Sequence, residues 1–279
     1  MPYPAFSKSP FLKILKSLAA STLLLVLSTT ALHAATEAIL RLDPGGHTTK
    51  IRNLLTTSDG RLITASYDKT IRVWNPQNGR EERKILGHIG LGFGQIYTIA
   101  LSPDGKLLAS GGFMDAPGVG GSGRIRLYDF QTGELLQILK GHENVVFDLA
   151  FSPDGRWLAS GSSDKTVRLW KRSGNRFSVG PVLRGHENDV YAVRLFEDSG
   201  RLRLVSASTD HTVRLWDAAS GQQLALGRHE KRVGSLAVGP DWIASAGDDK
   251  TIRIWDYSLR PLRTIRSETL PLGLAAHPD

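Results

Sequence analysis

Four segments of the chain repeat one pattern of residue types at fixed spacing, and this repetition limits the possible folds more than any other feature. The segments are LITASYDKTIRVWN (62–75), LASGSSDKTVRLWK (158–171), LVSASTDHTVRLWD (204–217) and IASAGDDKTIRIWD (243–256). In each segment a Ser or Thr stands ten residues before a Trp, an Asp stands six before it, and a His lies upstream. Self-similarity with a period of roughly 20 to 50 residues is typical of architectures that stack one supersecondary unit on the next.

Each repeat is predicted to form β-strands. The Trp ends a stretch such as TIRVW (70–74) or TVRLW (166–170), in which polar and apolar side chains alternate as they do in half-buried strands. Turn sequences with Pro, Asp and Gly, such as SPDG at 102–105 and 152–155, separate these stretches. We therefore expect each repeat to supply four short antiparallel strands, and we find no amphipathic helical pattern after residue 36.

A fifth copy of the pattern is altered. The segment LASGGFMDAPGVGGSGRIRLYD (108–129) keeps Ser110 and has Tyr128 where a Trp is expected. We interpret residues 113–123 as a loop insertion that displaces the Asp of this repeat, and Asp115 has the wrong spacing to replace it. This repeat is therefore expected to be the least well braced of the five.

The same insertion contains GVGGSG (118–123), whose glycine spacing matches the dinucleotide-binding motif. That motif requires a preceding strand, a following helix and an acidic residue about 20 positions further on. Glu143 has the right separation, but the segment that follows the glycines, RIRLYD, has the alternation of a strand. We conclude that the match is coincidental.

The spacing of the repeats, the Gly-His pairs upstream of them and the Trp-Asp ends at 216–217 and 255–256 resemble the WD-repeat family of β-propellers. The resemblance covers residues 37–279 and implies an all-β fold of five complete four-stranded blades. The repeats run over roughly 43–86, 87–140, 141–184, 185–227 and 228–266, and a further one starts at 267–279.

In that family the His, Ser/Thr, Asp and Trp of one blade form a hydrogen-bonded network that braces the sheet. The four sets expected here are His47, Thr64, Asp68 and Trp74; His142, Ser160, Asp164 and Trp170; His186, Ser206, Asp210 and Trp216; and His229, Ser245, Asp249 and Trp255.

The two ends of the repeat region suggest an incomplete ring. The segment EAILRLDPGGH (37–47) resembles the end of a repeat, and LPLGLAAHPD (270–279) resembles the first strand of another. Members of the family close the ring by combining such pieces in one blade. We therefore expect a partial closing blade, and a full-length protein with seven blades of which this chain is a fragment.

Residues 1–34 are predicted to be a secretory signal peptide. Three lysines precede an uncharged stretch that is most apolar over 18–27 and ends in small residues, as in signal peptides of exported proteins. The predicted location is therefore periplasmic or extracellular, in a bacterial type of protein. An uncleaved membrane anchor is the alternative, although seven Ser and Thr in the uncharged stretch make it a poor membrane helix.

Composition excludes several classes of site. The chain has no Cys, which rules out disulfides, thiolate metal sites and cysteine nucleophiles. Its net charge of +8 is distributed rather than clustered, so we expect no nucleic-acid partner.

An enzyme is the main competing class of function. Ser, His and Asp recur together as in hydrolase triads, but four copies indicate a structural device because an active site is normally built once. The chain contains no Gly-x-Ser-x-Gly motif, no calcium-binding carboxylate spacing and no His-rich metal motif. We therefore expect no catalysis and no cofactor. Two alternatives are an appended caspase-like peptidase or kinase domain beyond residue 279, as in similar bacterial proteins, and a propeller enzyme.

The predicted function is a protein–protein interaction scaffold that presents one rigid face to a peptide or protein. The resemblance implies contact positions just before each repeat Asp and in the first strand of each blade. These positions are Lys50, Arg52, Tyr67, Gln95, Tyr97, Val145, Phe147, Ser163, Asp189, Tyr191, Thr209, Arg232 and Asp248.

Overall fold

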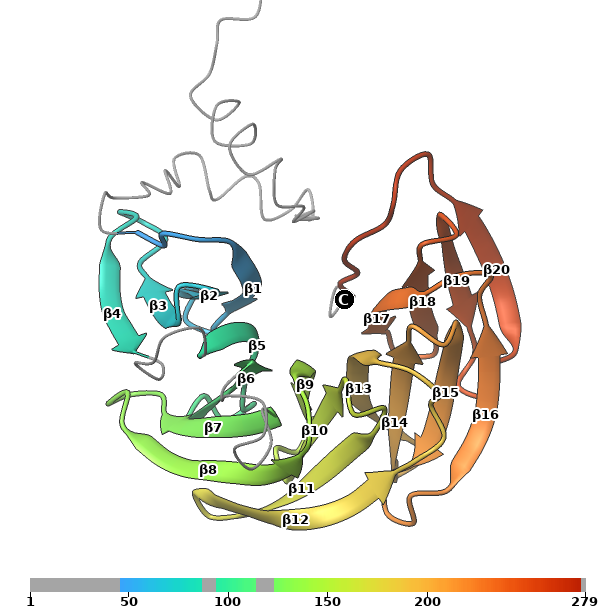
Figure 1. Ribbon diagram of the computed structural model, residues 1–279, viewed down its shortest axis with the longest axis horizontal. Helices are drawn as coiled ribbons and strands as arrows, with labels where there is room; N and C mark the ends of the chain where they lie inside the picture. The colour runs from blue at the N-terminus through green and yellow to red at the C-terminus, as the bar shows by residue number, and fades with distance from the viewer. Residues whose placement is uncertain (1–45, 87–93, 114–122, 277–279) are drawn as a thin grey trace, which may run out of the picture.

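The strands that the structure describes form five antiparallel sheets. The structure, a computed structural model, describes residues 46–86, 94–113 and 123–276 (Figure 1). These described residues do not include the predicted signal segment, most of the segment 37–47 that was expected to end a repeat, His88 of the second repeat or residues 114–122 of the glycine-rich insertion. Within the described ranges no helix has the length and hydropathy needed to cross a bilayer.

The described residues form twenty strands, four in each sheet and consecutive in sequence. The first sheet contains β1 (Ile51–Thr56), β2 (Leu62–Ser66), β3 (Thr70–Trp74) and β4 (Glu81–Leu86). The second contains β5 (Gln95–Leu101), β6 (Leu107–Phe113), β7 (Gly123–Asp129) and β8 (Leu135–His142). The third contains β9 (Val146–Phe151), β10 (Trp157–Ser162), β11 (Val167–Ser173) and β12 (Arg176–Leu183). The fourth contains β13 (Val190–Asp198), β14 (Arg201–Ser208), β15 (Thr212–Asp217) and β16 (Gln223–Arg228). The fifth contains β17 (Val233–Val238), β18 (Ile243–Gly247), β19 (Thr251–Trp255) and β20 (Pro261–Arg266).

The sheets are arranged in an arc around a common centre, as blades of a propeller (Figure 1). The first strand of each sheet lies nearest the centre and the fourth lies at the periphery. The prediction of five four-stranded blades is confirmed. Residues 267–276, which were expected to begin a further repeat, form no regular strand. The backbone N–H of Leu274 in this segment donates to Ser235 Oγ in β17 at 2.9 Å.

The hydrophobic core lies between neighbouring sheets. One cluster joins Ile63 and Ile71 of the first sheet to Ile99 and Leu108 of the second, and three further clusters join or fill the next sheets in the same way. Each sheet therefore buries its apolar side chains against the next one, as stacked repeats must because a single repeat cannot bury its own apolar face.

Polar contacts near the centre also link the sheets. Asp148 in β9 accepts hydrogen bonds from the backbone N–H of Val193 at 2.9 Å and from Arg194 Nη1 at 2.6 Å, both in β13. Thr98 in β5 donates to the other oxygen of Asp148 at 3.4 Å, and it accepts from Asn53 in β1 at 3.4 Å. A single line of hydrogen bonds thus joins the innermost strands of four blades.

The His, Ser/Thr, Asp and Trp side chains of each predicted set lie in contact. In the third sheet Trp170 Nε1 donates to Ser160 Oγ at 2.9 Å, Ser160 Oγ lies 2.7 Å from His142 Nε2, and His142 Nδ1 lies 2.7 Å from Asp164 Oδ2. The first, fourth and fifth sheets repeat these contacts, with distances of 2.7 to 3.0 Å between corresponding atoms. Each set connects the second and third strands to the segment that precedes the first.

The second sheet departs from this arrangement. Tyr128 occupies the Trp position and is buried, while the buried Ser110 Oγ has no hydrogen-bond partner in the structure. The strand β7 begins at Gly123, the last residue of the GVGGSG segment, so a strand and not a helix follows the glycines. A Cβ on Gly123 would lie 2.1 Å from the carbonyl oxygen of Asn144 and 2.5 Å from His142 Cβ. Gly123 is therefore required for close packing of the chain.

Candidate binding face

The first strand of every sheet carries one residue that has no partner in the ladder. At these β-bulges the pairing register skips one residue of the first strand. The skipped residues are Arg52, Tyr97, Phe147, Tyr191 and Gly234. A bulge re-aims the side chain of the extra residue, and bulges occur often beside functional sites. The five sheets thus place equivalent residues at one end of the central strands.

Aromatic side chains at these bulges contact one another from sheet to sheet. The ring centroids of Phe147 and Tyr191 are 4.3 Å apart with an angle of 14° between the planes. Tyr97 lies 6.0 Å from Phe147, also stacked, and Tyr67 lies 4.9 Å from Tyr97 in a tilted arrangement. These four half-buried rings, which we call the aromatic row, cross the first four sheets.

A guanidinium lies at each end of the aromatic row. Arg52 is within 5.6 Å of the Tyr67 ring centroid and within 5.8 Å of that of Tyr97. At the other end Arg232 lies 5.0 Å from the Tyr191 ring and forms an ion pair with Asp248 at 2.9 Å. Both arrangements are within the range of cation–π attraction, which holds the cations against the rings.

The remaining predicted contact residues surround the row. The residue before each repeat Asp donates its backbone N–H to the start of the first strand, as Tyr67 does to Lys50 at 3.1 Å and Thr209 to Asp189 at 3.0 Å. Ser163 Oγ donates to Asp189 Oδ1 at 2.8 Å. The equivalent backbone pairs in the third and fifth sheets are Ser163 with Val145 and Asp248 with Arg232.

Two of the predicted contact residues are placed differently from the rest. The Val145 side chain is buried and only 9% exposed, so it supports the face by packing and offers a partner almost no surface. Gln95 accepts a hydrogen bond from the Tyr97 hydroxyl at 3.3 Å and so positions that ring. The other predicted residues are exposed or half-buried at the same end of the blades.

Burial and contact with Tyr67 raise the pKa of Tyr97 above its usual value. Tyr97 is therefore neutral at physiological pH. Among the described residues there is no group of three His, Asp or Glu side chains that could hold a metal ion.

Sequence reasoning missed the central polar positions that support this face. Asn53, Thr98, Asp148 and Ser235 all follow the bulged residue of their strand, and the first three form the line of hydrogen bonds described above. Aligning the five first strands would have detected this recurrence of polar residues within otherwise apolar strands.

The family can be identified by comparison with known proteins. The family model described as "WD domain, G-beta repeat" (WD40) matches residues 39–75, 79–129, 133–171, 178–217 and 221–256. The chain belongs to the WD40 repeat family. The four matches in this WD40 chain that begin within the described residues start in or just before the outer strand of one blade, and they end in or just after the third strand of the next.

Relatives and a solved structure agree with this assignment. Nuclear distribution protein PAC1 of Arthroderma benhamiae is 38% identical over 147 residues, which cover 48% of this WD40 chain and 32% of PAC1. The guanine nucleotide-binding protein subunit beta of Solanum tuberosum is 31% identical over 220 residues, covering 76% of this chain and 57% of that protein. The solved structure of U3-55K has a TM-score of 0.68 and 28% identity, covering 79% of this chain and 65% of that one. The chain therefore spans between about a third and just over half of these curated relatives.

These relatives overturn the predicted location. The two curated relatives named above come from a fungus and a plant, and they are named for nuclear distribution and for guanine nucleotide binding. The prediction of an exported, periplasmic or extracellular protein is therefore wrong. The apolar N-terminal stretch that suggested it lies outside the described residues.

Proposed function

We propose that this WD40 chain is a non-catalytic scaffold that binds a peptide or protein segment across the aromatic row and its two flanking arginines. The observation that carries the proposal is the continuous contact from Arg52 through Tyr97, Phe147 and Tyr191 to Arg232, which joins all five blades on one face. Tyr and Arg are enriched among the residues that dominate binding energy at protein interfaces.

The geometry favours an extended ligand over a compact one. The row crosses several blades, and the rings of Tyr97, Phe147 and Tyr191 are fixed at β-bulges by the ladder on either side of them, so binding requires little ordering of the face. A rigid surface loses less conformational entropy on binding. The Arg52 guanidinium at one end favours a segment that carries an acidic residue near the aromatic or aliphatic side chains it places on the rings, whereas the charge of Arg232 is paired with Asp248.

Truncation of the row tests this function. Partners captured by the wild-type chain should be lost when Tyr97, Phe147 and Tyr191 are replaced together by Ala. Each single substitution should weaken the binding of an identified partner by about 2 kcal/mol, or roughly thirty-fold, as is typical of interface hot spots. Titration calorimetry with the purified partner would measure the change.

Trp242→Ala is the matched control. Trp242 is a half-buried aromatic residue in the turn between β17 and β18, at the opposite end of the strands, and its removal should leave capture unchanged. Circular dichroism and thermal unfolding would establish that the variants are folded. Retention of every partner by a folded triple variant would contradict the proposed face.

A further inference from the structure

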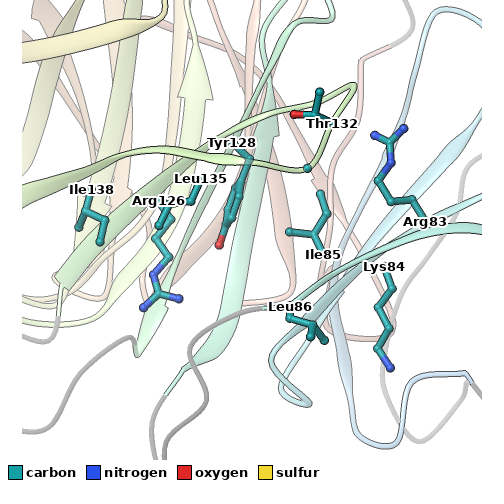
Figure 2. Close-up of a pocket in the computed structure, with 10 residues that line it drawn as sticks. Arg83, Lys84, Ile85, Leu86, Arg126, Tyr128, Thr132, Leu135 and Ile138 are labelled. Carbon is teal, nitrogen blue, oxygen red and sulfur yellow. The ribbon is translucent and has the colours of Figure 1, made fainter.

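A second surface, distinct from the aromatic row, lies between the periphery of the first and second blades. A pocket of about 690 Å³ is lined by β4 on one side and by β7, β8 and the turn between them on the other (Figure 2). Its apolar side chains include Leu86, Leu135 and Ile138, which are 59%, 45% and 36% exposed. This volume lies within the range of ligand-binding pockets.

The pocket contains a buried guanidinium without a partner. Arg126 of β7 lines the pocket and is 8% exposed. Its Nε has no hydrogen-bond partner in the structure, and no ion pair of Arg126 occurs among the described residues. Burying a charge without a partner is costly, so such a group is a strong site for an anion.

Two of the four equivalent arginines, in the first and fourth blades, show what Arg126 lacks, whereas Nε of Arg168 and of Arg253 also has no hydrogen-bond partner. Arg72 in β3 forms an ion pair with Glu81, nine residues later, and donates to Thr70 at 3.4 Å. Arg214 in β15 likewise donates to Gln223, nine residues later, at 2.6 Å, and to Thr212 at 3.2 Å.

In the second blade both acceptors are replaced. Leu135 occupies the position of Glu81 and Gln223, because it pairs with Tyr128 as those residues pair with their Trp. Arg124 occupies the position of the Thr, two residues before Arg126. The positions that supply hydrogen-bond acceptors to Arg72 and Arg214 therefore supply none to Arg126, and one of them carries the exposed apolar side chain of Leu135.

We propose that this pocket binds a segment of a partner protein in which a carboxylate side chain stands beside an aliphatic one. The carboxylate would accept hydrogen bonds from Arg126, in the role that Glu81 has for Arg72. The neighbouring aliphatic side chain would cover Leu86 and Leu135. No Asp or Glu is among the lining residues, whereas Arg83 and Lys84 of β4 are, so the charge of the pocket complements an acidic segment.

The position of the pocket favours a peptide segment. The strands β4 and β8 are the outermost strands of their sheets, so two strand edges border the pocket. A strand edge presents backbone donors and acceptors to which an extended peptide can pair.

The experiment uses a displayed library of random heptapeptides, selected in parallel on the full chain and on its Arg126→Gln variant. Peptides enriched only on the wild type should contain Asp or Glu next to Leu, Ile, Val or Phe. A synthetic peptide of the consensus should bind the variant at least ten-fold more weakly, and its own Glu→Gln or Asp→Asn version should bind the wild type equally weakly.

Since Arg126→Gln removes an unpartnered buried charge, the variant should unfold at a temperature no lower than the wild type.

Two further variants separate binding from folding. Leu135→Glu restores the acceptor found in the first blade, so it should raise the unfolding temperature and abolish peptide binding. Arg168→Gln alters the equivalent residue of the third blade, outside the pocket, and should bind the peptide as the wild type does.

The proposal is overturned if no peptide distinguishes the wild type from Arg126→Gln, or if the distinguishing peptides carry no carboxylate. Displacement of the consensus peptide by free 4-phenylbutyrate at equal concentration would identify a small-molecule site and overturn the peptide assignment. Replacement of Tyr97, Phe147 and Tyr191 by Ala should leave this binding intact, so the two proposed surfaces succeed or fail independently.

Discussion

At the scale of single residues, the hydrogen bonds of each set determine which ring nitrogen of its histidine carries the proton. In the third blade the ionised Asp164 accepts from His142 Nδ1–H, which leaves Nε2 to accept from the hydroxyl of Ser160. Ser160 Oγ in turn accepts from the indole N–H of Trp170. One neutral tautomer satisfies every group in this chain of hydrogen bonds.

A pair of serines tests the energetic value of this arrangement. Ser160→Ala should lower the free energy of unfolding by about 1–3 kcal/mol, because it leaves Trp170 Nε1 and His142 Nε2 buried without their shared partner. Ser110→Ala at the equivalent position of the second blade should be neutral or stabilising, because Ser110 Oγ has no partner to lose. Urea unfolding of both variants would measure the difference. Equal destabilisation by the two substitutions would contradict the bracing role.

At the scale of the strand and its turn, the connection between the second and third strands is built in one way in the first, third, fourth and fifth blades. The residue after the repeat Asp has a positive φ, as at Lys69 (70°), Lys165 (69°), His211 (71°) and Lys250 (61°). The Asp side chain accepts the backbone N–H two residues later, at 2.9 to 3.0 Å in each case. This Asx turn compensates for a backbone conformation that is unfavourable for Lys and His.

The close approach at Gly123 gives a second prediction. Gly123→Ala should destabilise the chain by at least about 2 kcal/mol, because the added Cβ would lie 2.1 Å from a backbone oxygen that cannot move freely. Gly234→Ala is the matched control in another strand, where an added Cβ meets nothing within 4 Å. Thermal unfolding should show a large loss for the first substitution and little change or a small gain for the second. A tolerated Gly123→Ala would mean that this glycine is not required by packing.

At the scale of the whole molecule, the repeated sets make the fold sensitive to acid. Burial lowers the pKa of His142, His186 and His229 below the usual value near 6.5, against the opposing effect of their Asp partners. For Asp249, burial opposes ionisation, but hydrogen bonds from Thr251, the backbone of Glu230 and His229 lower its pKa to about 2. Hydrogen bonds from histidine likewise hold the pKa of Asp164 and Asp210 well below its usual range.

The sign of the pH effect follows from these shifts. The three histidines bind protons more weakly in the folded chain than in the unfolded one. Their contribution to the free energy of unfolding is therefore fully present above about pH 6.5, and it is lost as the pH falls below that value. The limiting slope is about 1.4 kcal/mol per pH unit for each histidine. The aspartates add a further loss below about pH 4. Urea unfolding from pH 8 to pH 5 should therefore show decreasing stability, and a constant or rising value would contradict this account.

The repeated architecture could be predicted from sequence because its determinants recur at fixed spacing. Thr64, Asp68 and Trp74 define a strand, a turn and a strand within eleven residues, and four copies make the pattern unmistakable. The contact positions were inferred from family resemblance, but their stacking was not, because the distance between Phe147 and Tyr191 depends on how two sheets pack.

Other features depend on contacts between residues distant in sequence. The bridge from Asp148 to Arg194 joins two blades and has no local signal beyond a polar residue in an apolar strand. The lack of a partner for Arg126 follows from the strand register that places Leu135 opposite Tyr128. The predicted location failed for a different reason, because it depended on a composition pattern in a segment without repeats.

The β-bulges place the residues proposed to bind a ligand outside the strand pairing that holds the sheets together. Since the ladders omit Arg52, Tyr97, Phe147 and Tyr191, exchanging these side chains leaves strand pairing unchanged, and ligand preference can diverge while the scaffold is conserved. The fifth such position is Gly234, where a new side chain has open space. An aromatic residue introduced there would extend the aromatic row into the fifth blade. The binding face of this chain can therefore be made longer, and its ligand preference can be changed.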